Sequence, residues 1–202
     1  MNASEDQLEN CKDVGQDGSD EDLIAAFSRG STEAFDYLFS RYKQPLFAFF
    51  RRRMEDPGQA EELTQETFLV LLRGSPGYQP RALFRTYLFA IAFKILRAHR
   101  RRAALRATLL GAQIITRKVY EPAPDAELLV RQALAKLDSA DREILMLREF
   151  EQLSYAEIGT LLALPINTVR SRLFRARVAL RELLAGSTAS WATKFVGSEE
   201  RV

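Results

Sequence analysis

The side chains of this sequence best suited to chemistry are arginines on one face of a helix predicted near the C-terminus. Residues 166–184 read INTVRSRLFRARVALRELL. Apolar residues at spacings of four, three and four predict one buried stripe on this helix, formed by Val169, Leu173, Ala176 and Leu180. The opposite face carries Ser171, Phe174, Arg175 and Val178, with Arg170 at its edge. A polar and basic helix face of this kind fits the major groove of DNA.

The residues just before this helix are those needed to hold it in place. Ser154 and Glu157 have the S-x-x-E spacing of a capping box, which marks a helix start. Gly159 leaves room for the close approach of another helix. Residues 163–165 form a very short join, and Pro165 suits a first helical position. This pattern predicts a helix-turn-helix, whose second helix reads bases. The alternative is an ordinary antiparallel helix pair whose arginines are only solvated.

A second basic group ends a helix predicted over residues 84–102, which read FRTYLFAIAFKILRAHRRR. Its predicted core stripe consists of Leu88, Ile91, Ala92 and Ile95. Arginines gather near its C-terminus, where the helix dipole favours cations; they are Arg97, Arg100, Arg101 and Arg102. His99, the only histidine, stands among them. We interpret His99 as a phosphate contact or a solvated side chain.

No pattern in the chain predicts catalysis, a metal or a cofactor. Cys11 is the only cysteine, so no set of Cys and His residues has zinc-binding spacing. A single cysteine also indicates a reducing compartment. Neither a nucleophile with an adjacent base nor a pair of carboxylates on facing elements can be argued. The prediction is a protein that is not an enzyme and needs no cofactor.

Charge is distributed very unevenly along the chain. The first 22 residues carry a net charge of −7, and the remainder carries +9. A basic body behind an acidic leader is typical of a nucleic-acid-binding protein. The N-terminus lacks the order of a signal peptide, and the apolar runs are shorter than the roughly 20 residues that span a bilayer. We therefore expect a soluble, cytoplasmic protein with no membrane span.

The absence of period-two alternation predicts an all-α fold. We expect helices over residues 20–30, 32–54 with a kink or break at Pro45, and 60–74 after a turn at 56–58. In the last of these helices the predicted buried side consists of Leu63, Thr67, Val70 and Leu71. Residues 75–83 are expected to form a loop, and Asp138 is expected to cap a further helix.

The pattern predicts two small helical domains joined by a flexible linker. The expected segments are a disordered leader (1–20), an N-terminal helical bundle (21–102), a linker with prolines at 122 and 124 (103–126), a helix-turn-helix domain (127–185) and a tail (186–202). In the tail, Trp191, Phe195 and Val196 either pack onto the domain or form a patch that binds a partner.

Three segments together carry a resemblance to a known family. They are AEELTQETFLVLLR, FRTYLFAIAFKILRAHRRR and REILMLREFEQLSYAEIGTLLALPINTVRSRLFRARVAL. In this order they resemble the bacterial RNA polymerase sigma factors of the extracytoplasmic-function (ECF) group, within the sigma-70 family. The resemblance covers roughly residues 22–102 and 127–184. It implies a specificity subunit that binds promoter DNA and the clamp helices and flap of core RNA polymerase, with an anti-sigma factor as a further partner.

The resemblance also implies roles for particular residues. By this resemblance, the residues that bind the polymerase are Glu62, Gln65, Glu66 and Leu69. The residues implied in recognition and melting of the downstream (minus-ten) promoter element are Tyr78, Phe84, Tyr87, Lys94, Arg97, Arg100 and Arg101. The upstream (minus-thirty-five) element falls to Arg148, Thr168, Arg170, Ser171, Arg172, Phe174 and Arg175, of which Arg148 and Arg172 are expected on phosphates. Tyr87 and Phe89 are open to two interpretations, as core residues or as rings that stack on a base.

Several positions depart from the family pattern. Tyr87 replaces a usual Trp, Lys94 a common Asn and Ala98 a common Asp. Asp138 stands where Pro is frequent, and Ala163 stands where the turn usually has Gly. Ala163 suits the turn provided that it does not adopt a left-handed conformation.

Two other functions remain alternatives. An autonomous helix-turn-helix regulator would need a receiver or sensor domain, and residues 22–102 show no βα alternation. A nucleic-acid enzyme would need the catalytic residues that the sequence lacks.

Overall fold

The computed structural model describes residues 17–74, 83–109 and 126–196, without the side chains of 109, 126–128 and 186–196. The chain divides into two compact units, 1–115 and 116–202, which are described separately. All regular secondary structure in the described residues is helical, which confirms the all-α prediction. Most of the predicted leader, most of the loop at 75–83 with Tyr78, and the proline-containing part of the linker lie outside the described residues.

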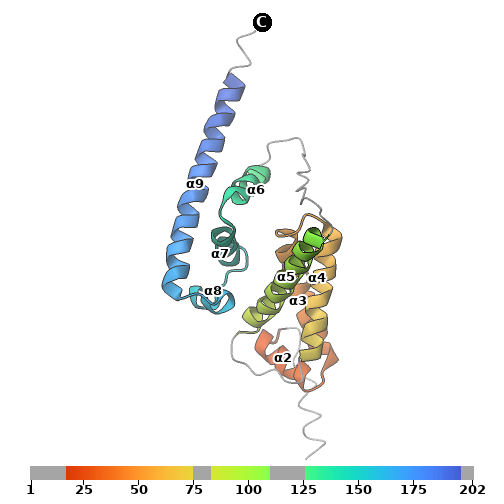
Figure 1. The fold of residues 1–202 in the computed structure, drawn as a ribbon. Helices are drawn as coiled ribbons and strands as arrows, with labels where there is room; N and C mark the ends of the chain where they lie inside the picture. The colour runs from red at the N-terminus through yellow and green to blue at the C-terminus, as the bar shows by residue number, and fades with distance from the viewer. Residues whose placement is uncertain (1–16, 75–82, 110–125, 197–202) are drawn as a thin grey trace, which may run out of the picture. The chain divides into compact units, whose positions relative to one another are not determined.

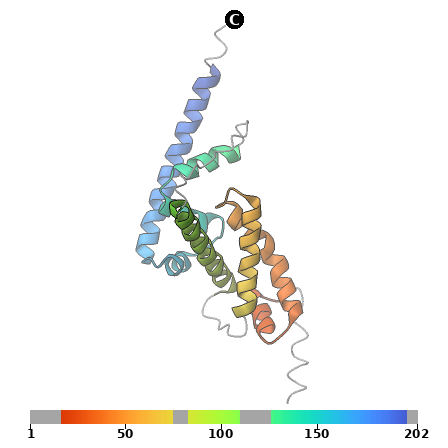
Figure 2. The same ribbon diagram turned by 45° about the vertical axis from the view of Figure 1, so that its right-hand side comes forward.

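In its described residues the first unit has four helices, α2 (Asp20–Ser28), α3 (Thr32–Arg51), α4 (Pro57–Gly74) and α5 (Phe84–Leu109). Helices α3, α4 and α5 lie side by side, and α2 packs across one end of them (Figures 1 and 2). The predicted start signals are confirmed, because the Ser19 side chain accepts from Asp22 N and the Ser31 side chain accepts from Ala34 N. Each hydroxyl satisfies one of the backbone donors that a helix leaves unpaired at its start.

The interior of this bundle is aliphatic and aromatic. The largest side chains that are almost fully buried include Leu38, Leu46, Phe49, Phe50, Leu88 and Phe89. The ring of Phe49 lies against both Phe50 and Phe89, with centroids 5.0 and 5.6 Å apart. Burying side chains of this size contributes about 1.5–3 kcal/mol each. The predicted stripe of α5 is confirmed, since Leu88, Ile91, Ala92 and Ile95 are all buried.

Helix α3 continues past Pro45 as predicted, without a break. Three other expectations about this unit need correction. Helix α4 begins at Pro57, where Asp56 Oδ1 accepts from Gly58 N at 2.9 Å. The predicted turn is therefore the start of a helix. Val70 is 38% exposed rather than buried, because Ala60, Thr64 and Phe68 complete the core face of α4 instead. Helix α5 continues to Leu109, so the predicted linker cannot begin at residue 103.

Acidic residues at the start of α2 connect it to α3 and α5. Asp20 accepts from Arg41 Nη1 at 2.8 Å and from the hydroxyl of Tyr42. Burial, then the hydrogen bond to Asp20, raises the pKa of Tyr42 above its ordinary value, which keeps this hydroxyl a donor at neutral pH. Glu21 Oε1 accepts from the backbone N–H of Phe84 at 3.1 Å. A side chain 63 positions earlier thus caps the first turn of α5.

Removing this cap is expected to loosen the start of α5. Glu21→Ala leaves the Phe84 N–H without its carboxylate partner and should lower the free energy of unfolding of the first unit by about 1 kcal/mol. The measurement is amide hydrogen exchange in the full chain, which should accelerate at Phe84 and the residues after it. Glu61→Ala, an exposed change on α4, serves as the control. Equal exchange at Phe84 in both variants would show that Glu21 does not hold the helix start.

The second unit contains α6 (Ala126–Lys136), α7 (Ser139–Glu149), α8 (Tyr155–Leu162) and α9 (Ile166–Val196). The shorter helices α6, α7 and α8 all pack against α9, the longest helix (Figure 1). Asp138 caps α7 as predicted, since Oδ2 accepts from Ala140 N at 2.9 Å. The backbone of α9 stays helical to Val196, into the segment expected to be a tail. The side chains of Trp191, Phe195 and Val196 lie outside the described part.

Candidate nucleic-acid interface

Helices α8 and α9 form the predicted helix-turn-helix, beginning with a complete capping box. Ser154 Oγ accepts from Glu157 N at 3.2 Å, and Glu157 Oε2 accepts from Ser154 N at 2.7 Å. These two bonds satisfy backbone donors that would otherwise be unpaired. They fix the residue at which α8 begins.

The turn between these helices depends on Ala163 and Gly159. Ala163 has φ 55° and ψ 47°, a left-handed conformation, so the condition under which an alanine would suit this turn is not met. The conformation lets Leu164 N donate to Gly159 O at 2.8 Å. A Cβ at Gly159 would lie 2.8 Å from the carbonyl oxygen of Leu164. The small residue therefore mainly accommodates the turn backbone, and Val169 of α9 lies 3.9 Å from the same Cβ position.

The turn geometry predicts opposite effects for two Ala→Gly changes. Ala163→Gly should stabilise the second unit by about 0.5 kcal/mol, because relief of the left-handed Ala exceeds the entropy cost of Gly. Ala179→Gly, in the right-handed interior of α9, should destabilise it by about 1 kcal/mol. Gly159→Ala should destabilise it by roughly 1–3 kcal/mol through overpacking. Chemical denaturation of the full chain measures all three; destabilisation by Ala163→Gly would contradict the left-handed turn.

The face of α9 expected to read DNA is exposed, and its opposite face is buried. Val169, Leu173 and Ala176 are at most 1% exposed, whereas Phe174 is 70% exposed. Around Phe174, the residues Arg170, Ser171 and Arg175 are also exposed. Thr168 and Val178 are half-buried at the margins of this face, and the Thr168 carbonyl accepts from Ser171 Oγ at 3.0 Å. The structure thus brings the predicted residues together on one basic surface with an exposed ring near its centre.

Arg148 has a structural role that the sequence did not indicate. Its Nη1 donates to Leu153 O at 3.0 Å, and its guanidinium lies over the ring of Tyr155, 5.4 Å from the centroid. These contacts brace the connection between α7 and α8. A guanidinium has five N–H groups, so this role leaves donors for a phosphate. Arg172, the other residue expected on phosphate, is half-buried beside the reading face.

In the first unit, the residues expected to bind polymerase lie on the outward side of α4. Glu62, Gln65 and Leu69 are exposed, and Glu66 is half-buried. Leu69 is 49% exposed. The buried residues Leu63, Thr67 and Leu71 hold the opposite side of the helix against the bundle.

On α5, the basic residues expected at the downstream element form an exposed stripe. Lys94, Arg97 and Arg101 follow one another at spacings of three and four, and Arg100 is also exposed. Tyr87 is half-buried, with its hydroxyl beside Gly74 at the end of α4, 3.4 Å from where a Cβ on Gly74 would lie.

Two aromatic residues of α5 belong to the core. Phe84 is 0% exposed and meets Tyr42 edge to face, with centroids 5.4 Å apart. Its ring has no face open to a base, so the prediction that Phe84 contacts the downstream element is wrong. Phe89 is 1% exposed, so of its two interpretations the structure supports that of a core residue. Amphipathic periodicity could not separate these rings from exposed ones, because their contacts with Tyr42 and Phe49 of α3 are formed across a long sequence separation.

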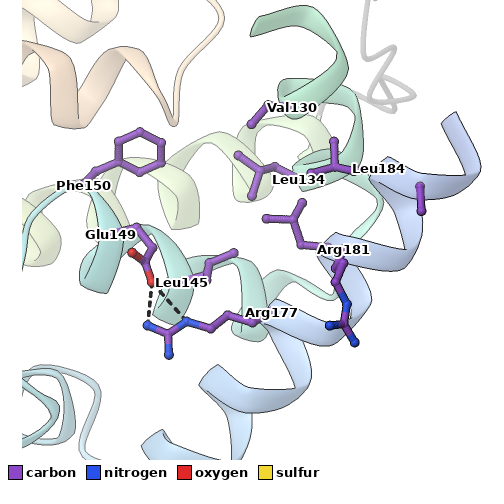
Figure 3. A pocket seen from close by; sticks show the side chains of 10 residues that line it. Val130, Leu134, Leu145, Glu149, Phe150, Arg177, Arg181 and Leu184 are labelled. Carbon is purple, nitrogen blue, oxygen red and sulfur yellow. Dashed lines mark hydrogen bonds and ion pairs between the residues drawn. The ribbon is translucent and has the colours of Figure 1, made fainter. Parts of the chain in front are cut away.

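An apolar groove of about 550 Å³ lies among α6, α7 and α9 and was not predicted (Figure 3). Apolar side chains from all three helices line it, including Val130, Leu134, Leu145, Phe150, Leu180 and Leu184. Phe150 is 45% exposed there. Arg177 Nη2 donates to Glu149 Oε1 at 2.7 Å along one wall, which links α7 to α9. That hydrogen bond raises the pKa of Arg177.

Comparison with known proteins now assigns both units. The family model for sigma-70 region 2 matches residues 38–105, and the model for sigma-70 region 4 matches residues 127–180. The RNA polymerase sigma-H factor of Pseudomonas aeruginosa is 31% identical over 180 residues, covering 82% of this chain and 93% of that protein. The chain belongs to the RNA polymerase sigma factors. The ECF RNA polymerase sigma factor SigC of Mycobacterium tuberculosis is 31% identical over 80% of this chain and 91% of that protein.

Solved structures agree with this sigma-factor fold. The sigma factor RpoE in complex with the anti-sigma factor NepR from Bartonella quintana matches with a TM-score of 0.67 and 22% identity, over 76% of this chain and 98% of that one. CnrH in complex with the cytosolic domain of CnrY matches with a TM-score of 0.63 and 26% identity, over 83% and 97%.

As a sigma factor of the ECF group, the protein directs promoter-specific initiation by RNA polymerase. The family matches do not favour the alternative of an autonomous regulator, because sigma-70 region 2 occupies the residues in which a sensor domain would be needed. Sigma factors are DNA-binding regulators of transcription. Among the described residues no group of three or more His, Cys, Asp or Glu is placed to hold a metal ion. None of the described helices is both long and apolar enough to cross a membrane.

Proposed function

We propose that the second unit reads the upstream promoter element through the exposed face of α9. The observation that carries this proposal is the pairing of an exposed Phe174 and Arg175 with the buried Val169, Leu173 and Ala176 on the opposite side of the helix. Arg175 and Arg170 are suited to guanine, which accepts two hydrogen bonds from one guanidinium in the major groove. Phe174 is suited to the methyl group of thymine. Ser171 and Thr168 supply shorter polar contacts, and Arg148 and Arg172 bind phosphates.

Base readout predicts a different signature for Arg175 than for Arg172. Arg175→Ala should cost about 1–3 kcal/mol at one base pair of the upstream element and relax the preference there. Arg172→Ala should weaken binding to all sequences alike and lower the salt slope by about 0.9. The measurement is the affinity of the holoenzyme for single-base variants of the element at two salt concentrations. Arg172 is the matched control, three residues away on the same helix. If Arg175→Ala loses affinity uniformly and keeps every base preference, the reading face is wrongly assigned.

We propose that the first unit docks on the clamp helices of the largest polymerase subunit through the outward side of α4. This side combines the carboxylates of Glu62 and Glu66 with the amide of Gln65 and the exposed Leu69. An apolar side chain surrounded by charges is typical of a protein interface, where the apolar group supplies affinity and the charges supply orientation.

Reversing these charges should weaken core binding. The double change Glu62→Lys and Glu66→Lys should reduce affinity for core polymerase roughly tenfold or more, because like charges would face each other across the interface. Titration of labelled protein with core polymerase measures this. The control is Glu55→Lys with Glu61→Lys, two exposed acids of the same unit with the same total change in charge. Equal affinity of the two double variants would remove α4 from the polymerase interface.

We propose that α5 and the segment before it hold the downstream element. Lys94, Arg97, Arg100 and Arg101 supply cations for the backbone of the DNA. Tyr78 and Tyr87 supply rings for an unpaired base, and stacking of this kind contributes about 1–3 kcal/mol per base. Trapping of a melted strand by stacking requires no ATP.

Two further partners complete the proposal. The flap of core polymerase binds the apolar groove of the second unit, which apolar side chains of α6, α7 and α9 line and where Val130 and Phe150 are partly exposed. An anti-sigma factor restrains the protein, as a partner of that kind accompanies the solved sigma factor RpoE. Action on RNA polymerase would require the protein in the cytoplasm.

A further inference from the structure

Helix α2 holds the first turn of α5 at two points. Glu21 Oε1 accepts from the backbone N–H of Phe84 at 3.1 Å, and the ring of Phe84 meets that of Tyr42 edge to face. The hydroxyl of Tyr42 in turn donates to Asp20, the neighbour of Glu21 in the chain. Two adjacent carboxylates of α2 therefore converge on one residue of α5, the first directly and the second through α3. Both contacts lie at the start of the helix, where backbone N–H groups have no partner within the helix itself.

The same turn of α5 carries Tyr87. Tyr87 N donates to Leu83 O at 3.1 Å, and this bond closes the turn that contains Phe84. Residues three positions apart are neighbours on a helix surface, so the ring of Tyr87 follows that of Phe84. Phe84 is fully buried, whereas Tyr87 is half-buried and its hydroxyl lies beside Gly74 at the end of α4. The place of the Tyr87 ring therefore depends on where the first turn of α5 is held.

Glu21 lies on a different helix from every residue proposed to contact DNA. Its carboxylate is half-buried and bound to the N–H of Phe84. A carboxylate would also repel a DNA phosphate rather than bind it. Any favourable effect of Glu21 on DNA binding must therefore be exerted through the first turn of α5.

We propose that Glu21 is a positioning residue for the downstream element, which holds the first turn of α5 so that Tyr87 can stack on an unpaired base. The proposal rests on the proposed function, in which Tyr87 supplies such a ring. Stacking requires a ring in contact with the face of the base, and groups that form a binding site need to be held to within about 0.5 Å. The carboxylate of Glu21 supplies that restraint from a separate helix.

The test measures how much one base of the downstream element contributes to binding by the holoenzyme. The ligands are single-stranded oligonucleotides that carry the element either intact or with one abasic position, which is moved along the element in turn. The ratio of the two affinities at the held base, here called the abasic penalty, should be roughly fivefold or more for wild type. Because the penalty is a ratio measured on one protein, it does not depend on the fraction of that protein that is folded.

Glu21→Ala should lower the abasic penalty from roughly fivefold to roughly twofold or less, because the ring of Tyr87 loses its fixed place. Glu21→Gln keeps an acceptor for the Phe84 N–H and should retain the wild-type penalty. The control Glu33→Ala removes an exposed acid from the first turn of α3, with the same change in charge, and should also retain it. The double change Glu21→Ala with Tyr87→Ala should lower the penalty no further than Tyr87→Ala alone. All variants should bind core polymerase as wild type does.

A wild-type penalty in Glu21→Ala, or equal reductions in Glu21→Ala and Glu33→Ala, would overturn the positioning role. A double variant with a lower penalty than Tyr87→Ala would overturn it too, since Glu21 would then act by another route. If Tyr87→Ala itself left the penalty unchanged, the proposed function of Tyr87 would fail, and the positioning role with it.

Discussion

The direction of α9 depends on one backbone feature, the turn in which Ala163 is left-handed and Leu164 donates to Gly159. This turn sets the angle at which α9 leaves α8, and the buried Val169, Leu173 and Ala176 then fix its rotation. These contacts therefore determine which face of α9 is exposed. A left-handed alanine costs about 1 kcal/mol that a glycine would not. The unit tolerates that cost because the capping box and the apolar stripe stabilise the same arrangement.

A comparable constraint acts in the first unit through α2. Asp20 joins α2 to α3 through Arg41 and Tyr42, and Glu21 joins it to the first turn of α5. The start of α5 is therefore fixed by a carboxylate as well as by the burial of Phe84. Its other end is exposed from residue 100 to 106 and carries four arginines. The start of α5 is thus packed, and it follows the segment proposed to hold a base. The other end of the same helix is basic and available to backbone phosphates.

Local signals explain why so much of the helix-turn-helix was predictable. The capping box, the short join and the four-three-four spacing all lie within some thirty residues, and each depends only on near neighbours in the chain. The conformation of Ala163 was not predictable, because an alanine gives no signal for a left-handed backbone. The burial of Phe84, the link from Glu149 to Arg177 and the apolar groove were also missed. Each requires segments distant in sequence to meet, and periodicity carries no information about which segments do so.

The end of α5 was misjudged for a different reason. Residues 103–109 lack an apolar stripe, and such a stripe was the basis on which the other helices were recognised. Ala, Leu and Arg nevertheless have high intrinsic helix propensity, which continues the helix without a core to pack against. A helix segment without an apolar face depends on this propensity rather than on packing against a core.

The central claim is that this chain gives core RNA polymerase its choice of promoter. Run-off transcription with purified core polymerase and genomic DNA fragments tests it most directly. If the protein is a promoter-specific sigma factor, discrete transcripts are expected from a few fragments when it is present and none from core polymerase alone. Those transcripts should disappear when the upstream element of the same fragments is scrambled. Transcripts that appear equally without the protein, or that are indifferent to the upstream element, would contradict the account.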